Sequence, residues 1–122
     1  MTLQEREARA CAIIDNMAPE LRAISLYLHD NPELGLNEHK AVKAIHQFLE
    51  KQNFISQVGL ADMRELQTAL RADYRCNAKY KIAFLGEYDA LPELGHGCGH
   101  NLIAMMSLGA AVAFSQSAPQ DW

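Results

Sequence analysis

The residues from 87 to 101 combine most of the side-chain types in this sequence that could do chemistry. Cys98 and His100 lie two positions apart there, together with His96, three carboxylates and three glycines. In an extended or turning backbone, residues two apart lie on the same face, and glycines permit such a turn. A thiolate and an imidazole are ordinary ligands for zinc and related divalent ions. The spacing therefore predicts a metal site that uses Cys98 and His100.

A carboxylate, Asp89, follows an apolar run over residues 80–85. This run is typical of a strand buried in a parallel sheet, and open α/β sheets bind ligands at the carboxyl ends of such strands. A carboxylate at that place can accept the second N–H of a ligating imidazole and so fix its tautomer. It could also lie nearer the metal, and the sequence leaves both roles open.

Two other interpretations of this segment also stay open. Cys98 could be a nucleophile with His100 or His96 as its base, although the sequence identifies neither an oxyanion pocket nor an orienting group. Alternatively, the glycines could simply hold a capped helix, with the cysteine as a small core residue and a histidine as a cap.

Helical patterns fill the chain before and after this segment. Thr2 and Glu5 have the spacing of a capping box, and apolar residues then recur at steps of three and four until Asn31, which precedes a proline. Pro19 interrupts this stripe and predicts a kink or a junction of two helices. Two further helices are expected, over residues 37–52 with Asn37 as N-cap, and over about residues 101–115.

Strands are expected over residues 54–58, 66–72 and 80–85. With the helices, they indicate an α/β fold. The chain has 122 residues, of which 49% are hydrophobic, and a formal charge of −4. Such a chain can build one core, and its acidic balance argues against a nucleic-acid partner.

The cysteines and the apolar runs of the sequence indicate where in the cell the protein is found. Three widely spaced cysteines, with Cys11 and Cys76 interpreted as inert thiols, are not a disulfide framework. There is no apolar signal region at the charged N-terminus and no run of about 18 apolar residues. We therefore expect a cytoplasmic protein that does not contact a membrane.

The motifs resemble those of metallopeptidase family M-twenty, and more narrowly its amidohydrolase branch of aminoacylase-like, aminobenzoyl-glutamate hydrolase-like and dipeptidase-like enzymes. The resemblance extends over nearly the whole chain and is specific in its combination. It is carried by residues 28–35 with Glu38 following, by residues 86–92, and by residues 95–103.

This resemblance implies that residues 1–122 are the N-terminal portion of a metallo-amidohydrolase catalytic domain, without the rest of that domain or the lid and dimerisation domain. Helices would pack on a small, mostly parallel sheet, as in zinc peptidases. The implied reaction is hydrolysis of an amide bond in N-acyl amino acids or small dipeptides, with two zinc or manganese ions. Cys98 and His100 match metal ligands, Cys98 as a possible bridge between the ions, and Asp89 matches the catalytic carboxylate that supports the site.

Two positions depart from the most common pattern of the family. Glu87 stands where other branches have a ligand histidine, as acidic residues do in the cysteine-containing branch. Asn101 replaces an aspartate, which is consistent with the dipeptidase-like subgroup.

The sequence after His100 contains one carboxylate, Asp121, and no histidine, so a general base is missing. We therefore expect the chain to be inactive on its own and to form a homo-oligomer. The alternative is a non-catalytic remnant that self-associates or binds a partner through an uncovered sheet edge and apolar face.

Overall fold

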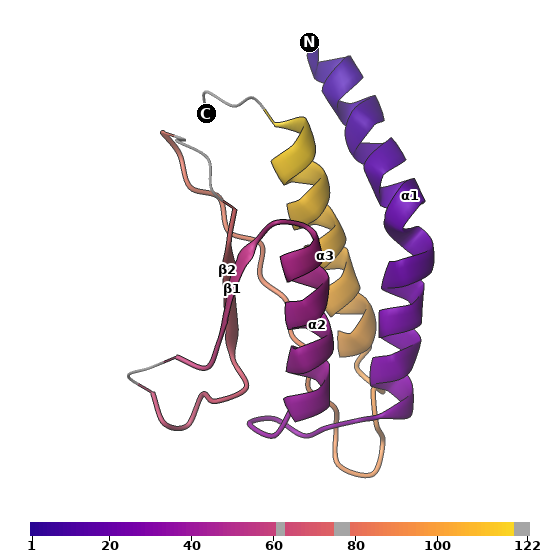
Figure 1. The fold of residues 1–122 in the computed structure, drawn as a ribbon. Coiled ribbons are helices and arrows are strands. Elements are labelled where there is room, and N and C mark those ends of the chain that lie inside the picture. Colours follow the sequence, from indigo (N-terminus) through magenta and orange to yellow (C-terminus); the bar gives the residue numbers. More distant parts are fainter. Residues whose placement is uncertain (61–62, 75–78, 119–122) are drawn as a thin grey trace.

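A computed structural model describes residues 1–60, 63–74 and 79–118 of the chain. In these ranges α2 and α3 lie between α1 and a two-stranded sheet (Figure 1). The elements in chain order are α1 (Leu3–Asp30), α2 (His39–Lys51), β1 (Ile55–Val58), β2 (Leu70–Asp73) and α3 (His100–Ser117).

The long helix α1 begins at the predicted capping box. The Thr2 hydroxyl accepts the Glu5 amide at 3.2 Å, and the Glu5 carboxylate accepts the Thr2 amide at 2.6 Å. The predicted junction at Pro19 is wrong, because α1 is one helix of 28 residues that contains this proline. Pro19 is exposed, so water can satisfy the carbonyl that lacks its helical donor, while Met17 and Leu21 on either side stay buried in the core.

The start of α2 is capped from a distance. Glu38, and not the predicted Asn37, is the N-cap residue, and its side chain makes no capping hydrogen bond. The Glu33 carboxylate accepts the Lys40 amide at 2.9 and 3.0 Å and the Ala41 amide at 2.8 Å. A negative charge at these free amides stabilises the helix.

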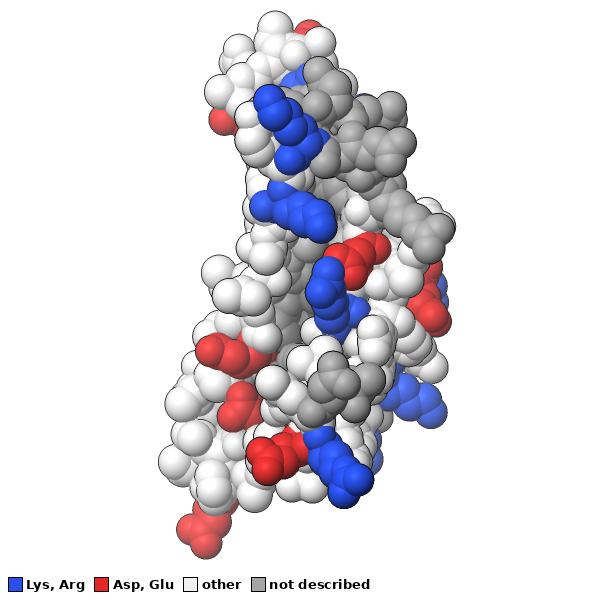
Figure 2. Space-filling model, turned by 90° about the vertical axis from the view of Figure 1, so that its left-hand side faces the viewer, with Lys and Arg blue, Asp and Glu red and all other residues white. Residues whose placement is uncertain are grey.

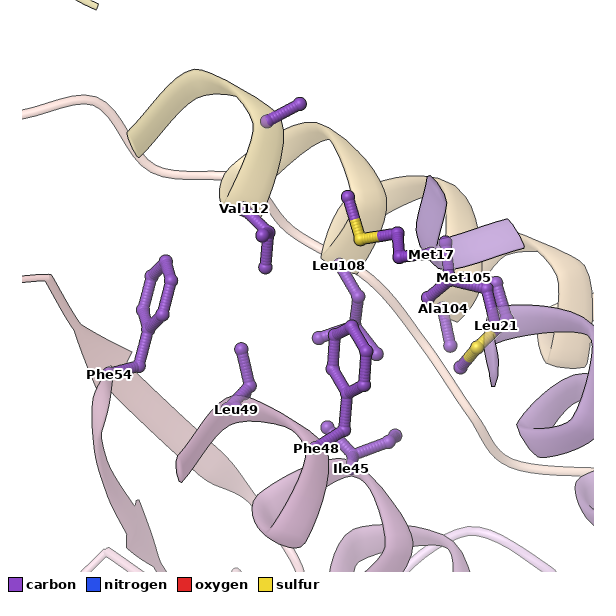
Figure 3. Close-up of a cluster of buried hydrophobic side chains, with 11 residues drawn as sticks. Met17, Leu21, Ile45, Phe48, Leu49, Phe54, Ala104, Met105, Leu108 and Val112 are labelled. Carbon is purple, nitrogen blue, oxygen red and sulfur yellow. The ribbon is translucent and has the colours of Figure 1, made fainter. Parts of the chain in front are cut away.

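The hydrophobic core lies where the three helices meet (Figure 3). The apolar face of α2 is buried against α3. At Gly109 of α3, a Cβ would lie 3.2 Å from the Leu21 side chain, so glycine permits a close approach of α1 and α3 there. The core comprises Met17, Leu21, Ile45, Phe48, Leu49, Phe54, Ala104, Met105, Leu108, Val112 and Ala113.

The sheet differs from the prediction. β1 and β2 pair antiparallel, with Ile55 opposite Asp73 and Val58 opposite Leu70, so the expected mostly parallel sheet is wrong for the described residues. The one parallel pairing described is an isolated bridge between Leu34 and Ala90. Cys76 lies outside the described residues.

The apolar run predicted as a buried strand is neither a strand nor buried. Residues 80–85 are exposed, Leu85 to 86%, and within the described ranges no strand pairs with them. An apolar run indicates a tendency to be buried, but a strand also needs a neighbour that completes its hydrogen bonds. Within the described residues this run has no such neighbour, and it therefore does not form a strand.

This run is nevertheless fixed against α3 just before the candidate site. The Ser107 hydroxyl donates a hydrogen bond to the Leu85 carbonyl. At Gly86 a Cβ would lie 3.0 Å from the Ser107 Cβ, closer than packed atoms normally approach. Glycine at this position therefore lets the backbone pass close to α3 on its way to Asp89.

Candidate metal centre

Asp89 and His100 form a direct pair in the structure. The His100 Nδ1 lies 2.8 Å from the Asp89 Oδ1 and 3.1 Å from the Asp89 carbonyl oxygen. Because both oxygens accept hydrogen bonds, the proton belongs on Nδ1, which donates it to Asp89. The Nε2 of the neutral ring then keeps a free electron pair, and the Glu87 Oε2 lies 3.5 Å from it.

A tight turn places His100 at the start of α3. Leu91 and Gly95 exchange two backbone hydrogen bonds of 2.8 and 3.2 Å, and the Gly99 amide donates to the His96 carbonyl at 3.0 Å. Gly99, the N-cap, has φ +78°, a conformation that strongly favours glycine. The third helix therefore begins one residue earlier than predicted, with His100 in its first turn.

Contacts on both sides hold Asp89 in place. On one side, the Ala90 amide donates to the Glu33 carbonyl at 2.7 Å. On the other, the Tyr88 hydroxyl donates to the Thr68 carbonyl. The sequence motifs contained Tyr88 without assigning it a role. For Thr68 no sequence signal exists, because it contacts Tyr88 only through the fold.

Cys98 is an exposed free thiol in the same turn, two residues before His100. No group of three or more His, Cys, Asp or Glu side chains that could hold an ion is found in the part of the chain that the structure describes. The structure thus brings Asp89 and His100 together with Glu87. The role of Cys98 as a ligand stays a prediction.

His96 lies close enough to the pair for its pKa to depend on Asp89 and His100. Burial lowers the pKa of the His96 imidazole most, although the Leu28 backbone acts in the opposite direction. Its Nδ1 is buried, and this ring nitrogen of His96 has no hydrogen-bond partner among the described residues.

Asn101 connects the start of α3 to α1. Its side chain is buried, and its Nδ2 donates to the Ser25 carbonyl at 3.3 Å and to the Ser25 hydroxyl at 3.1 Å. An aspartate could not donate to a carbonyl and would bury a charge there. The departure from the family pattern at this position thus has a structural consequence.

This donor set fits a divalent ion in part. A histidine that donates one ring nitrogen to a carboxylate and leaves the other free is the usual arrangement of a metal-ligating imidazole. His100 meets this description, and Cys98 offers a thiol from the same turn. The carboxylates of Glu87 and Asp89 make the surroundings of the His100 ring favourable for a cation.

Comparison with known proteins identifies relatives for most of the chain, although no family model matches it. The Xaa-Arg dipeptidase of Mus musculus is 37% identical over 116 residues, and the alignment covers 90% of this chain and 27% of the relative. The Xaa-Arg dipeptidase of Homo sapiens is 34% identical over 119 residues, with the same coverage of 90% and 27%. The N-acetyldiaminopimelate deacetylase of Oenococcus oeni is 32% identical over 120 residues, covering 84% of this chain and 30% of the relative.

These names confirm the predicted resemblance to peptidases and amidohydrolases. The chain spans 27% of the length of the dipeptidases it matches. Within the described residues, no helix combines the length and apolar character needed to cross a membrane.

Proposed function

We propose that this chain, which belongs by its relatives to the M-twenty-like peptidases and amidohydrolases, provides part of a metal centre that hydrolyses amide bonds. The observation that supports it most is the contact of 2.8 Å between His100 Nδ1 and Asp89 Oδ1. The proposed substrates are N-acyl amino acids or small dipeptides, in line with the deacetylase and dipeptidase names of the relatives. The proposed location is the cytoplasm.

The proposed roles combine the geometry of the turn with what the family resemblance implies. His100 would hold a zinc or manganese ion through Nε2, and Cys98 through its thiolate, in a centre that takes two ions when complete. Bound metal would polarise the substrate carbonyl and increase the acidity of water. Asp89 accepts the Nδ1 proton of His100 and thereby keeps the ring in the tautomer and orientation that a ligand needs.

A general base is the part of the mechanism that α3 does not provide. Residues 101–118 contain neither an acidic residue nor a histidine. Hydrolysis by this mechanism needs a group that takes the proton of the attacking water. Inactivity of the 122 residues on their own accordingly stays our prediction.

Metal content tests the proposal directly. After purification without a chelator, we expect bound zinc in the wild-type chain and its loss in Cys98→Ser, because serine offers a much poorer ligand than a thiolate. Elemental analysis gives the zinc content per chain. Cys11→Ser is the matched control, since Cys11 is also an exposed free thiol but lies on α1, and it should retain the metal. No zinc in the wild type, or equal zinc in Cys98→Ser, would contradict the metal centre.

A second candidate function, self-association, is favoured by the exposed apolar run. Ile82 is 53% exposed and Leu85 86%, and this run lines a cavity of about 670 Å³ together with residues of β2 and α3. Figure 2 views the molecule from the side of the sheet and shows charges of both signs scattered among uncharged residues. Exposed apolar surface beside an open strand edge favours association.

Sedimentation velocity tests this candidate. We expect a dimer at micromolar concentration, and a shift toward monomer in Leu85→Gln because the substitution removes apolar area from the contact. The control is Leu3→Gln, which changes another exposed leucine, at the first position of α1. A stable monomer in the wild type would rule out self-association.

A further inference from the structure

Tyr88 is a partly buried hydrogen-bond donor beside the candidate site. Its hydroxyl donates to the Thr68 carbonyl, just before β2. Burial, together with the nearby Glu38 charge, raises the pKa of Tyr88 to about 12. The phenol is therefore protonated, and able to donate, throughout the neutral and moderately alkaline range.

Glu38 contributes the second part of the same network. Only 9% of Glu38 and 3% of Thr68 are exposed, and the Thr68 hydroxyl donates to the Glu38 Oε2. A buried carboxylate is costly unless it is hydrogen-bonded. Because Glu33 caps α2, the Glu38 side chain is free to hold Thr68 instead.

This network is connected to Asp89 in two ways, by the adjoining backbone and by a space that the Asp89 and Glu38 side chains share. Tyr88 precedes Asp89 directly, and the residue after it, Ala90, is anchored to the Glu33 carbonyl at 2.7 Å. A Cβ on Gly35 would lie 3.9 Å from the Asp89 Oδ2 and 4.0 Å from the Glu38 Oε1, so both carboxylates border the same small space. The backbone at Asp89 is thus fixed on both sides.

We propose that Tyr88 and Glu38, connected by Thr68, are positioning residues that hold Asp89 against His100 and so set the tautomer of the imidazole. Neither residue contacts Nδ1 of His100 itself. The catalytic meaning of this network rests on the proposed function, but its geometric effect can be measured without metal or substrate.

Nitrogen-15 NMR of the His100 ring in the metal-free chain tests the proposal. At about pH 8.5, where an ordinary histidine is neutral, we expect mainly the Nδ1–H tautomer in the wild type. In Tyr88→Phe and in Glu38→Ala, the ratio of the Nδ1–H to the Nε2–H tautomer should fall about tenfold, the effect of weakening one charged hydrogen bond. Glu38→Gln keeps an oxygen acceptor for the Thr68 hydroxyl and should restore most of the wild-type ratio.

Two controls separate positioning from general loss of structure. Tyr74→Phe also removes a phenol hydroxyl, but from an exposed tyrosine next to β2, and should leave the tautomer ratio unchanged. Met17→Ala destabilises the core on α1 and should lower the unfolding midpoint without changing the ratio. The ratio is read only from folded protein, and either Tyr88→Phe or Glu38→Ala is sufficient for the test.

An unchanged tautomer ratio in a folded Tyr88→Phe or Glu38→Ala chain would overturn the positioning proposal. This outcome is distinguishable from failure of the proposed function. If the wild-type chain binds no zinc but the variants change the tautomer ratio, the positioning network is supported and the metal centre is contradicted. If the wild-type chain binds zinc but the variants keep the wild-type tautomer ratio, the metal centre is supported and the positioning network is contradicted.

Discussion

Replacing Phe48 with alanine is expected to lower the free energy of unfolding by about 3–5 kcal/mol, because it leaves a large cavity in the core. The Phe48 side chain is 1% exposed and belongs to the cluster in which the three helices meet (Figure 3). A domain of this size is stable by only about 5–15 kcal/mol. The substitution should therefore remove a large share of the free energy of unfolding. Urea denaturation followed by circular dichroism measures this loss.

Phe84→Ala is the matched control for this experiment. Phe84 is 40% exposed and lies in the run over residues 80–85, outside the core cluster. Its truncation should cost clearly less, even though its ring lies 5.8 Å from that of Phe114. Equal losses for Phe48 and Phe84 would mean that the helices do not form the main core.

The helices could be predicted because their signals are local. The third helix was expected over about residues 101–115 and is observed at His100–Ser117, and the second was expected to stop near Gln52 and ends at Lys51. Apolar steps of three and four residues report which face of a helix is buried, whatever it packs against. The capping box at Thr2 is equally local, since both partners lie within one turn.

Features that depend on distant residues were not predicted. The cap of α2 comes from Glu33, seven residues before Lys40, whose amide is the first that it accepts. A search for a capping residue next to the helix finds Asn37 instead. The antiparallel pairing of β1 and β2 likewise depends on which strands are neighbours. An apolar pattern contains no information about that choice.

The candidate site lies between these two cases. The spacing of Cys98 and His100 indicated metal chemistry, and the chemistry of such sites then required a carboxylate behind the imidazole. The structure places Asp89 there, eleven residues earlier in the chain. The residues that hold Asp89, Thr68 among them, could not be found in this way, since their contacts join segments far apart in the sequence, such as Tyr88 and Thr68.

Replacing Asp89 with alanine is expected to weaken zinc binding by about 10- to 100-fold, the usual cost of losing the carboxylate behind a ligating histidine. Without it, the His100 ring can rotate and can carry its proton on Nε2, the nitrogen that would bind the ion. Competition with a zinc indicator at fixed pH measures the affinity. Circular dichroism of the same samples establishes that the variants are folded.

Two further variants show whether the charge of Asp89 or its hydrogen bond is responsible. Asp89→Asn keeps an oxygen that accepts the Nδ1 proton but removes the charge, so it should lose less affinity than Asp89→Ala. Asp73→Ala removes a carboxylate that pairs with Arg71 on β2 and should not change the affinity. Wild-type zinc affinity in Asp89→Ala would mean that the Asp89 carboxylate does not contribute to metal binding. Binding by His100 would then have to be oriented by the helix start alone, and the contact at 2.8 Å would no longer support a catalytic role.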